Sequence, residues 1–200
     1  MTINLQKGQR ISLKKEAPTL QRLMCGLGWD VAQRSGGGLL GLLKGNQEYD
    51  LDASVLCLDP NEKIRDVSNV IYFGNLRHRS GAITHLGDNL TGQGEGDDEQ
   101  IIIDLPEVPS QIGKLVIVVN IYDCLARNQD FSQINNAFVR LVNLGNNQEI
   151  ARYNLSGGEY HGMTGMVMAE IYRDGNDWNM AAVGRGIKVK GLEDLIKSYS

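Results

Sequence analysis

The sequence lacks the long apolar segments that mark membrane-spanning and secreted chains. Its most apolar run, Leu115 to Tyr122, is interrupted by Asn120 and is far shorter than the roughly 20 residues that cross a bilayer. The N-terminal segment MTINLQKGQRISLKK has no apolar stretch of about 7–15 residues, so we expect no secretory signal. The cysteines are odd in number and form no C-x-x-C pair, which favours a reduced, cytoplasmic protein. They are Cys25, Cys57 and Cys124.

An excess of basic residues is also missing. The chain has 20 Lys and Arg against 24 Asp and Glu, a net charge of −4, whereas nucleic-acid binding calls for a basic patch or stripe. We therefore expect no nucleic-acid partner. The negative charge is concentrated between Asp88 and Glu99, which hold five acids and no Lys or Arg. Without those five charges the rest of the chain sums to +1, so one short loop carries the acidity of the whole protein.

Extended helical periodicity is nearly absent, and short alternating apolar and polar runs fill most of the sequence. In residues 50–59, for example, Leu51, Ala53, Val55 and Cys57 share one face, the pattern of a half-buried strand. About eleven such runs are separated by turn-like stretches. They cover residues 10–13, 24–29, 50–59, 70–73, 82–86, 100–105, 115–122, 138–142, 149–155, 166–172 and 179–183.

The number and spacing of these runs predict an all-β protein, a two-sheet β-sandwich. Residues 191–199 place Leu192, Leu195, Ile196 and Tyr199 at i, i+3, i+4 and i+7, which predicts a short C-terminal helix. We see no internal repeat and expect residues 1–200 to form a single domain.

Residues 35–45 (SGGGLLGLLKG) combine flexible glycines with four leucines. One interpretation is a mobile surface loop whose leucines fold back on the sandwich. The other is an exposed apolar finger that touches a membrane or a partner protein. The sequence does not decide between them.

The acidic loop GDNLTGQGEGDDE, residues 87–99, indicates a cation site. Two carboxylates about 5 Å apart at an effective dielectric near 20 repel by roughly 3 kcal/mol, so a folded loop holding Asp88, Asp97, Asp98 and Glu99 together needs a compensating cation. Calcium accepts six to eight oxygen ligands at about 2.3–2.6 Å in a tolerant geometry. The glycines allow backbone carbonyls to turn inward as further ligands. The alternative is an acidic hairpin that is merely solvated.

Other metal-site and ligand-site types do not fit this loop. An EF-hand frame from Asp88 to Glu99 would place Leu90 and Gly92 at ligand positions and Gln93 at the required glycine. Zinc is disfavoured because only His85 lies nearby as a nitrogen or sulfur donor. A phosphate cradle is disfavoured because the carboxylates would repel the anion.

Further oxygen donors are expected from elsewhere in the chain. Asp50 and Asp52 are two positions apart on a predicted strand, so they point to the same face. Their alternative role is to end a strand at a solvated edge. Asp30 is a weaker candidate ligand, since a turn residue after Gly28 and Trp29 explains it equally well.

The loop motif resembles the signature of the TerD family, named for bacterial tellurite resistance, and the likeness extends over nearly the whole chain. The Gly/Leu segment before Asp50 is similar to the TerZ branch of that family. The other motifs that carry the resemblance are KKEAP (residues 14–18), GLGWD (26–30), DLDAS (50–54), NNAFVR (135–140), EIARYNL (149–155) and AEIYR (169–173) with Trp178.

The resemblance implies a β-sandwich, cytoplasmic calcium binding at the acidic loop and a role in stress or tellurite resistance. It adds Asn89 to the loop ligands, and we expect more than one Ca²⁺ ion. It also implies assembly with other tellurite-resistance proteins, peripheral to the inner membrane. We expect no small-molecule substrate.

Two other functions compete with a calcium-binding interaction module. A tellurite reductase would need a reactive thiol or a redox cofactor, and a metal-assisted hydrolase would need water activated at the metal. The cysteines and histidines show no such arrangement, so we expect a protein that is not an enzyme. Calcium-dependent membrane docking through the leucines of residues 35–45 is the third possibility, although no basic cluster reinforces it.

Overall fold

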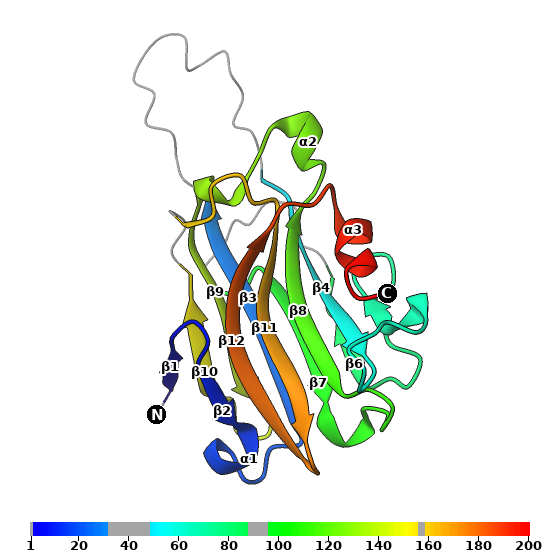
Figure 1. The fold of residues 1–200 in the computed structure, drawn as a ribbon. Coiled ribbons are helices and arrows are strands. Elements are labelled where there is room, and N and C mark those ends of the chain that lie inside the picture. The colour runs from blue at the N-terminus through cyan, green and yellow to red at the C-terminus, as the bar shows by residue number, and fades with distance from the viewer. Residues whose placement is uncertain (1, 32–48, 88–95, 156–158) are drawn as a thin grey trace.

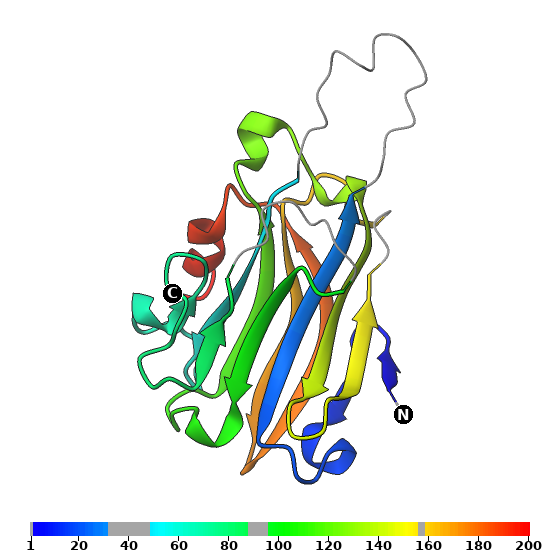
Figure 2. The ribbon, with the colours of Figure 1, turned by 180° about the vertical axis from the view of Figure 1, so that it is seen from behind.

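The computed structural model describes residues 2–31, 49–87, 96–155 and 159–200, and these form two facing sheets. Sheet A has the strand order β1 (Ile3–Leu5), β10 (Gln148–Asn154), β9 (Ile134–Asn143), β3 (Arg22–Val31), β7 (Glu99–Asp104) and β6 (Ile83–His85). Sheet B has the order β2 (Arg10–Ser12), β12 (Asp177–Ile187), β11 (Gly165–Asp174), β8 (Lys114–Ile121), β4 (Leu51–Leu58) and β5 (Val70–Ile71). Figures 1 and 2 show the two layers from opposite sides.

Helices are short and lie outside the two sheets. They are α1 (Leu13–Glu16), α2 (Cys124–Arg127), α3 (Leu192–Lys197) and the 3₁₀ turns η2 (Val67–Asn69), η3 (Leu105–Glu107) and η4 (Phe131–Gln133). The predicted sandwich and the predicted C-terminal helix are therefore confirmed. No helix among the described residues combines the length and the apolar character needed to span a membrane.

Strand alternation builds the core, but one sheet is buried on both faces. Leu51, Ala53, Val55 and Cys57 of β4 pack between the sheets, in the large central cluster. The intervening Leu56 and Leu58 belong to a second cluster, which includes Leu195 of α3. Figure 1 shows α3 lying over the outer side of β8 and β4. The C-terminal helix therefore covers a strand face that alternation alone predicts to be solvated.

A close contact between the sheets fixes one glycine. Gly184 of β12 has φ of +56°, and a Cβ added there would lie 2.0 Å from the hydroxyl oxygen of Tyr153 on β10. Tyr153 is buried in the central cluster, so it cannot simply move into solvent. The site thus combines a left-handed backbone with a lack of space, and both favour glycine.

We expect Gly184→Ala to lower the free energy of unfolding by at least 3 kcal/mol, since it adds a clash to the roughly 1–2 kcal/mol cost of the left-handed backbone. Gly175→Ala is the matched control, because Gly175 has φ of +61° but nothing within 4 Å of the added Cβ. Urea unfolding of both variants measures the difference. Equal losses in the two variants would show that Tyr153 does not restrict this position.

Candidate functional site

The described end of the acidic loop, Gly96 to Glu99, leads directly into β7. Its three consecutive acids contact three different parts of the fold. The loop positions Asp88 and Asn89 lie outside the described residues, as does the Gly/Leu segment 35–45. The site is therefore built from the described acids and their neighbours.

Asp97 forms a bidentate ion pair with Arg140 of β9. The Arg140 Nε and Nη2 atoms donate to Asp97 Oδ1 and Oδ2 at 2.7 and 2.9 Å, and the Asp97 side chain is fully buried. The hydrogen bonds that Arg140 donates to Asp97 are the main cause that raises the pKa of Arg140 above its usual range. A Cβ at Gly26 would lie 2.4 Å from the Asp97 carboxylate, so this glycine makes room for the pair. Asp97 therefore anchors the end of the loop on sheet A.

Glu99 points between the sheets and contacts the edge of β4. Its Oε2 accepts a hydrogen bond from the Ala53 N–H at 3.0 Å and lies 2.9 Å from Nε2 of His85. The same Nε2 lies 3.2 Å from the Ala53 carbonyl oxygen. Because β5 pairs with only Val55 and Leu56 of β4, the Glu99–His85 pair satisfies the backbone edge of β4 where β5 has ended.

The tautomer of His85 follows from its other ring nitrogen. The backbone N–H of Gly87 donates to His85 Nδ1 at 3.1 Å, which requires a lone pair on Nδ1. The ring proton therefore lies on Nε2, where it faces Glu99 and the Ala53 carbonyl. Both side chains are about 1% exposed, so the pair is sealed from water.

Asp98 faces a shallow cavity of about 350 Å³ on sheet A. Its Oδ2 accepts a hydrogen bond from the Trp29 N–H at 2.8 Å, and Asp30 Oδ2 accepts one from Asn136 Nδ2 at 2.7 Å. Burial raises the pKa of Asp98, and the negative charges of Asp30 and Asp97 raise it further, against the lowering effect of the Trp29 hydrogen bond. The lining residues are Trp29, Asp30, Gly96, Asp98, Asn136, Phe138 and Arg152.

The remaining candidates, Asp50 and Asp52, do not line this cavity. Asp52 is buried and lies opposite Asn120 of β8, whose Nδ2 is 3.5 Å from Asp52 Oδ2. Asp50 Oδ2 lies 4.0 Å from Nη1 of Arg127. In the part of the chain that the structure describes, no three His, Cys, Asp or Glu side chains are grouped closely enough to hold a metal ion.

The chemistry available here is that of hard oxygen donors. All three cysteines are buried, and burial raises the pKa of the Cys57 thiol to about 12 and also raises that of Cys25. A thiol that stays protonated is a poor nucleophile and a poor metal ligand. The cavity itself offers the carboxylates of Asp30 and Asp98 and the amide of Asn136.

Sequence reasoning missed two residues of this region, Arg140 and His85. Arg140 pairs with Asp97, which lies 43 positions away in the sequence. The only sequence signal for Arg140 was its place in the NNAFVR motif. His85 entered the sequence analysis only as a possible zinc ligand; it lies in β6 and is buried beside Glu99. Its position two residues before the loop was the available signal.

Comparison with known proteins gives a consistent family. Residues 1–199 match the model of the TerD domain. Stress response protein SCP2 of Bacillus subtilis (strain 168) is 54% identical over 200 residues. The alignment covers 100% of this chain and 100% of the relative. Tellurium resistance protein TerD of Serratia marcescens is 42% identical over 199 residues, which cover 100% of this chain and 97% of the relative.

A solved structure, described as a homologue of the telluride resistance protein (TerD) from Streptomyces coelicolor A3(2), matches with a TM-score of 0.66. The match covers 90% of this chain and 98% of that chain at 20% identity, so it supports the fold alone. Tellurium resistance protein TerZ of Serratia marcescens is 37% identical over 195 residues, covering 96% of this chain and 94% of the relative. Overall identity therefore does not favour TerZ over TerD.

We expect His85→Ala to lower the free energy of unfolding by about 3 kcal/mol, because it leaves Glu99 and the Ala53 carbonyl buried without this partner. The exposed His161 supplies the control, and His161→Ala should change stability by less than about 0.5 kcal/mol. Urea unfolding at neutral pH measures both. Similar small changes in the two variants would mean that the buried pair does not hold the edge of β4.

The raised pKa of Asp98 makes the stability of the folded chain depend on pH. The folded chain binds the Asp98 proton more tightly than the unfolded chain does, so the contribution of this group to stability falls as pH rises from about 4 through the folded pKa. The Asp98→Asn variant can still accept the Trp29 hydrogen bond but carries no charge. In chelator at pH 7 we therefore expect it to raise the melting temperature. At pH 4 we expect a smaller rise. A lower melting temperature at pH 7 would contradict this.

Proposed function

This chain belongs to the TerD family, and we propose that it is a calcium-binding stress-response protein that acts as an interaction module and not as an enzyme. In this proposal the acidic loop binds Ca²⁺ at its junction with sheet A, and the ion orders a surface that a partner protein recognises. The relatives named for stress response and for tellurium resistance support a role of this kind in the cell.

The observation that carries the proposal is the juxtaposition of Asp98 and Asp30 in one cavity. Asp98 is partly buried, and burial together with the negative charge of Asp30 beside it disfavours its charged form, so a bound divalent cation would remove the repulsion and replace the lost hydration. The donors in the cavity are oxygens, which calcium prefers over nitrogen or sulfur. Asp88 and Asn89 are proposed to complete the coordination from the loop.

Asp97 and Glu99 have a different role in this proposal. Asp97 is held by Arg140 and Glu99 faces His85 inside the sandwich, so both fix the end of the loop and set the direction of Asp98 between them. This arrangement pre-positions one ligand before the ion arrives. Pre-positioning reduces the ordering cost of binding.

A second ion is proposed near Asp50 and Asp52. Asp52 lies beside Asn120, and Asn120 Oδ1 is buried without a hydrogen-bond partner among the described residues. Buried polar oxygens of this kind call for a partner, and a hard cation is one that several oxygens can share. More than one calcium per chain is therefore part of the proposal.

The proposed setting is the cytoplasm, with other tellurite-resistance proteins as partners, at or near the inner membrane. The buried thiols argue against a reductase that works through a cysteine. The membrane-docking alternative depends on residues 35–45, which lie outside the described residues, so no observation here favours it.

Thermal unfolding tests the calcium proposal. Calcium at about 100 times its dissociation constant should stabilise the folded chain by about 2.7 kcal/mol, a rise in melting temperature of roughly 5–10 °C over the same protein in chelator. Asp98→Asn and Asp30→Asn should each remove most of this rise. Asp174→Asn is the matched control, since the exposed Asp174 ends β11 and does not line the cavity, and it should keep the full rise.

Identical melting curves in calcium and in chelator would contradict calcium binding altogether. An undiminished rise in both Asp98→Asn and Asp30→Asn would instead remove the cavity from the site, even if calcium binds elsewhere on the chain.

A further inference from the structure

We propose that a second cavity, on the outer face of sheet A, binds a small zwitterion, a molecule with an oxyanion and an ammonium group a few bonds apart. The cavity has a volume of about 370 Å³, within the range of small-molecule sites. We call it the Arg22–Arg77 pocket. Its lining residues are Arg22, Arg77, Ser80, Gly81, Ala82, Thr84, Ile102, Asp104 and Glu107.

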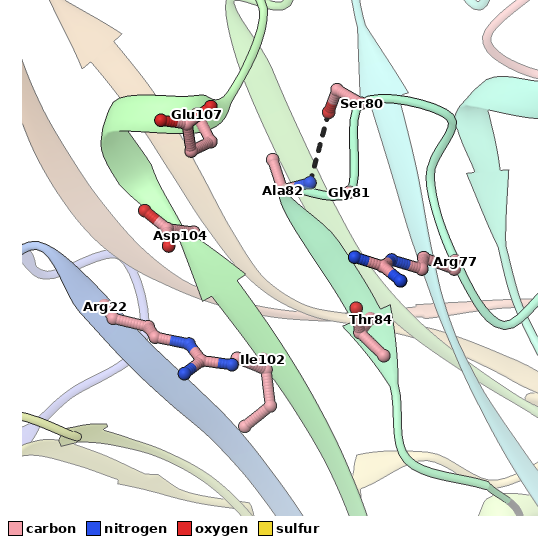
Figure 3. A pocket seen from close by; sticks show the side chains of 9 residues that line it. All are labelled: Arg22, Arg77, Ser80, Gly81, Ala82, Thr84, Ile102, Asp104 and Glu107. Atoms are coloured by element: carbon pink, nitrogen blue, oxygen red, sulfur yellow. Dashed lines mark hydrogen bonds between the residues drawn. The ribbon is translucent and has the colours of Figure 1, made fainter.

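The positive end of the pocket consists of two arginines from separate elements. Figure 3 shows Arg22 reaching from β3 and Arg77 from the chain before β6, so that their guanidinium groups face each other across Ile102 and Thr84. Guanidinium groups present paired N–H donors that match the oxygens of a carboxylate or a phosphate. Two of them around one hollow provide an oxyanion site.

The Arg77 guanidinium lies close to the backbone of the turn at Gly81. A Cβ at Gly81 would lie 3.1 Å from Arg77 Nη2, and Gly81 has φ of +80°. The turn at Gly81 thus lets the guanidinium lie directly against the main chain. The backbone bridge between Arg77 and Thr84 places the base of the Arg77 side chain beside β6.

The negative end of the pocket consists of Asp104 and Glu107. Figure 3 shows Asp104 at the end of β7, next to Arg22, and Glu107 beyond it in η3, with Arg77 on the other side of the hollow. Asp104 is the direct cross-strand neighbour of Arg22, yet among the described residues none of the four charged side chains forms an ion pair. The arginines and the acids therefore line one hollow as separate charges.

This separation determines the class of ligand. The two arginines and two acids sum to zero, so a simple oxyanion at the arginines would face repulsion from Asp104 and Glu107, and a simple cation would face the reverse. A molecule with a charge of each sign satisfies both ends at once. Ile102 and Ala82 form an apolar floor between the ends, and Thr84 adds a hydroxyl. The Ser80 hydroxyl is already used by the Ala82 N–H and His78.

The pocket is separate from the proposed calcium site. Arg22 and Asp30 stand at opposite ends of β3, eight residues or roughly 26 Å apart along the strand. Failure of either proposal therefore leaves the other unaffected.

Titration of the full-length protein with O-phosphoethanolamine tests the proposal, with inorganic phosphate and ethanolamine as single-charge comparators. We expect phosphoethanolamine to bind at least about tenfold more tightly than either comparator, and Arg22→Gln and Arg77→Gln each to weaken it at least about tenfold. Arg185→Gln, an exposed arginine on sheet B, should leave binding unchanged. Isothermal titration calorimetry provides the affinities.

Asp104→Asn gives a signature that a structural defect cannot mimic. It should tighten the binding of inorganic phosphate, because a repulsive charge is removed, while reducing the advantage of phosphoethanolamine over phosphate. Unchanged selectivity in this variant would contradict the assignment of the negative end.

Vesicles containing phosphatidylethanolamine distinguish the two sources of such a headgroup. Co-sedimentation that Arg22→Gln abolishes supports a lipid ligand, and binding of free phosphoethanolamine without co-sedimentation supports a soluble one. If neither form binds at millimolar concentration, or if both arginine variants bind as the unaltered protein does, the proposal is overturned.

Discussion

The pairing of Glu99 with His85 against the edge of β4 fixes the point where the chain from the acidic loop enters β7. Buried carboxylates are costly unless they are paired and hydrogen-bonded, and Glu99 has both kinds of partner, in His85 and the Ala53 N–H. Because β5 is only two residues long, the edge of β4 needs this contact to satisfy its backbone. The strand edge and the loop therefore stabilise each other.

A second buried pair, Asp97 with Arg140, fixes the loop on the other side of the same sheet. Between the two anchors, Asp98 is directed toward Trp29 and Asp30, where burial and neighbouring negative charge raise its pKa. An acid that is destabilised in its charged form while its neighbours are satisfied is a common feature of binding sites. We propose that a bound cation removes this local cost.

The fold was largely predictable from the sequence, and the site only in part. Among the described strands, alternating and apolar runs identified all but β1, because side-chain burial leaves these patterns in the sequence of a strand. It did not show that α3 would cover Leu56 and Leu58, since a short helix docks through contacts distant in sequence. Charge density located the acidic loop. It could not show that Asp97 would meet Arg140 or that Glu99 would turn inward, because partner choice depends on the register of β3, β7 and β9.

Terbium luminescence tests the central claim most directly, because Tb³⁺ occupies oxygen-rich calcium sites and emits when a nearby indole transfers energy to it. Trp29 lines the cavity beside Asp30 and Asp98, while Trp178, the second of the two tryptophans, lies on β12 of the other sheet. The account predicts sensitised emission that calcium displaces, that Trp29→Phe abolishes and that Trp178→Phe retains. Emission that persists in Trp29→Phe and disappears in Trp178→Phe would place the ion elsewhere and contradict it.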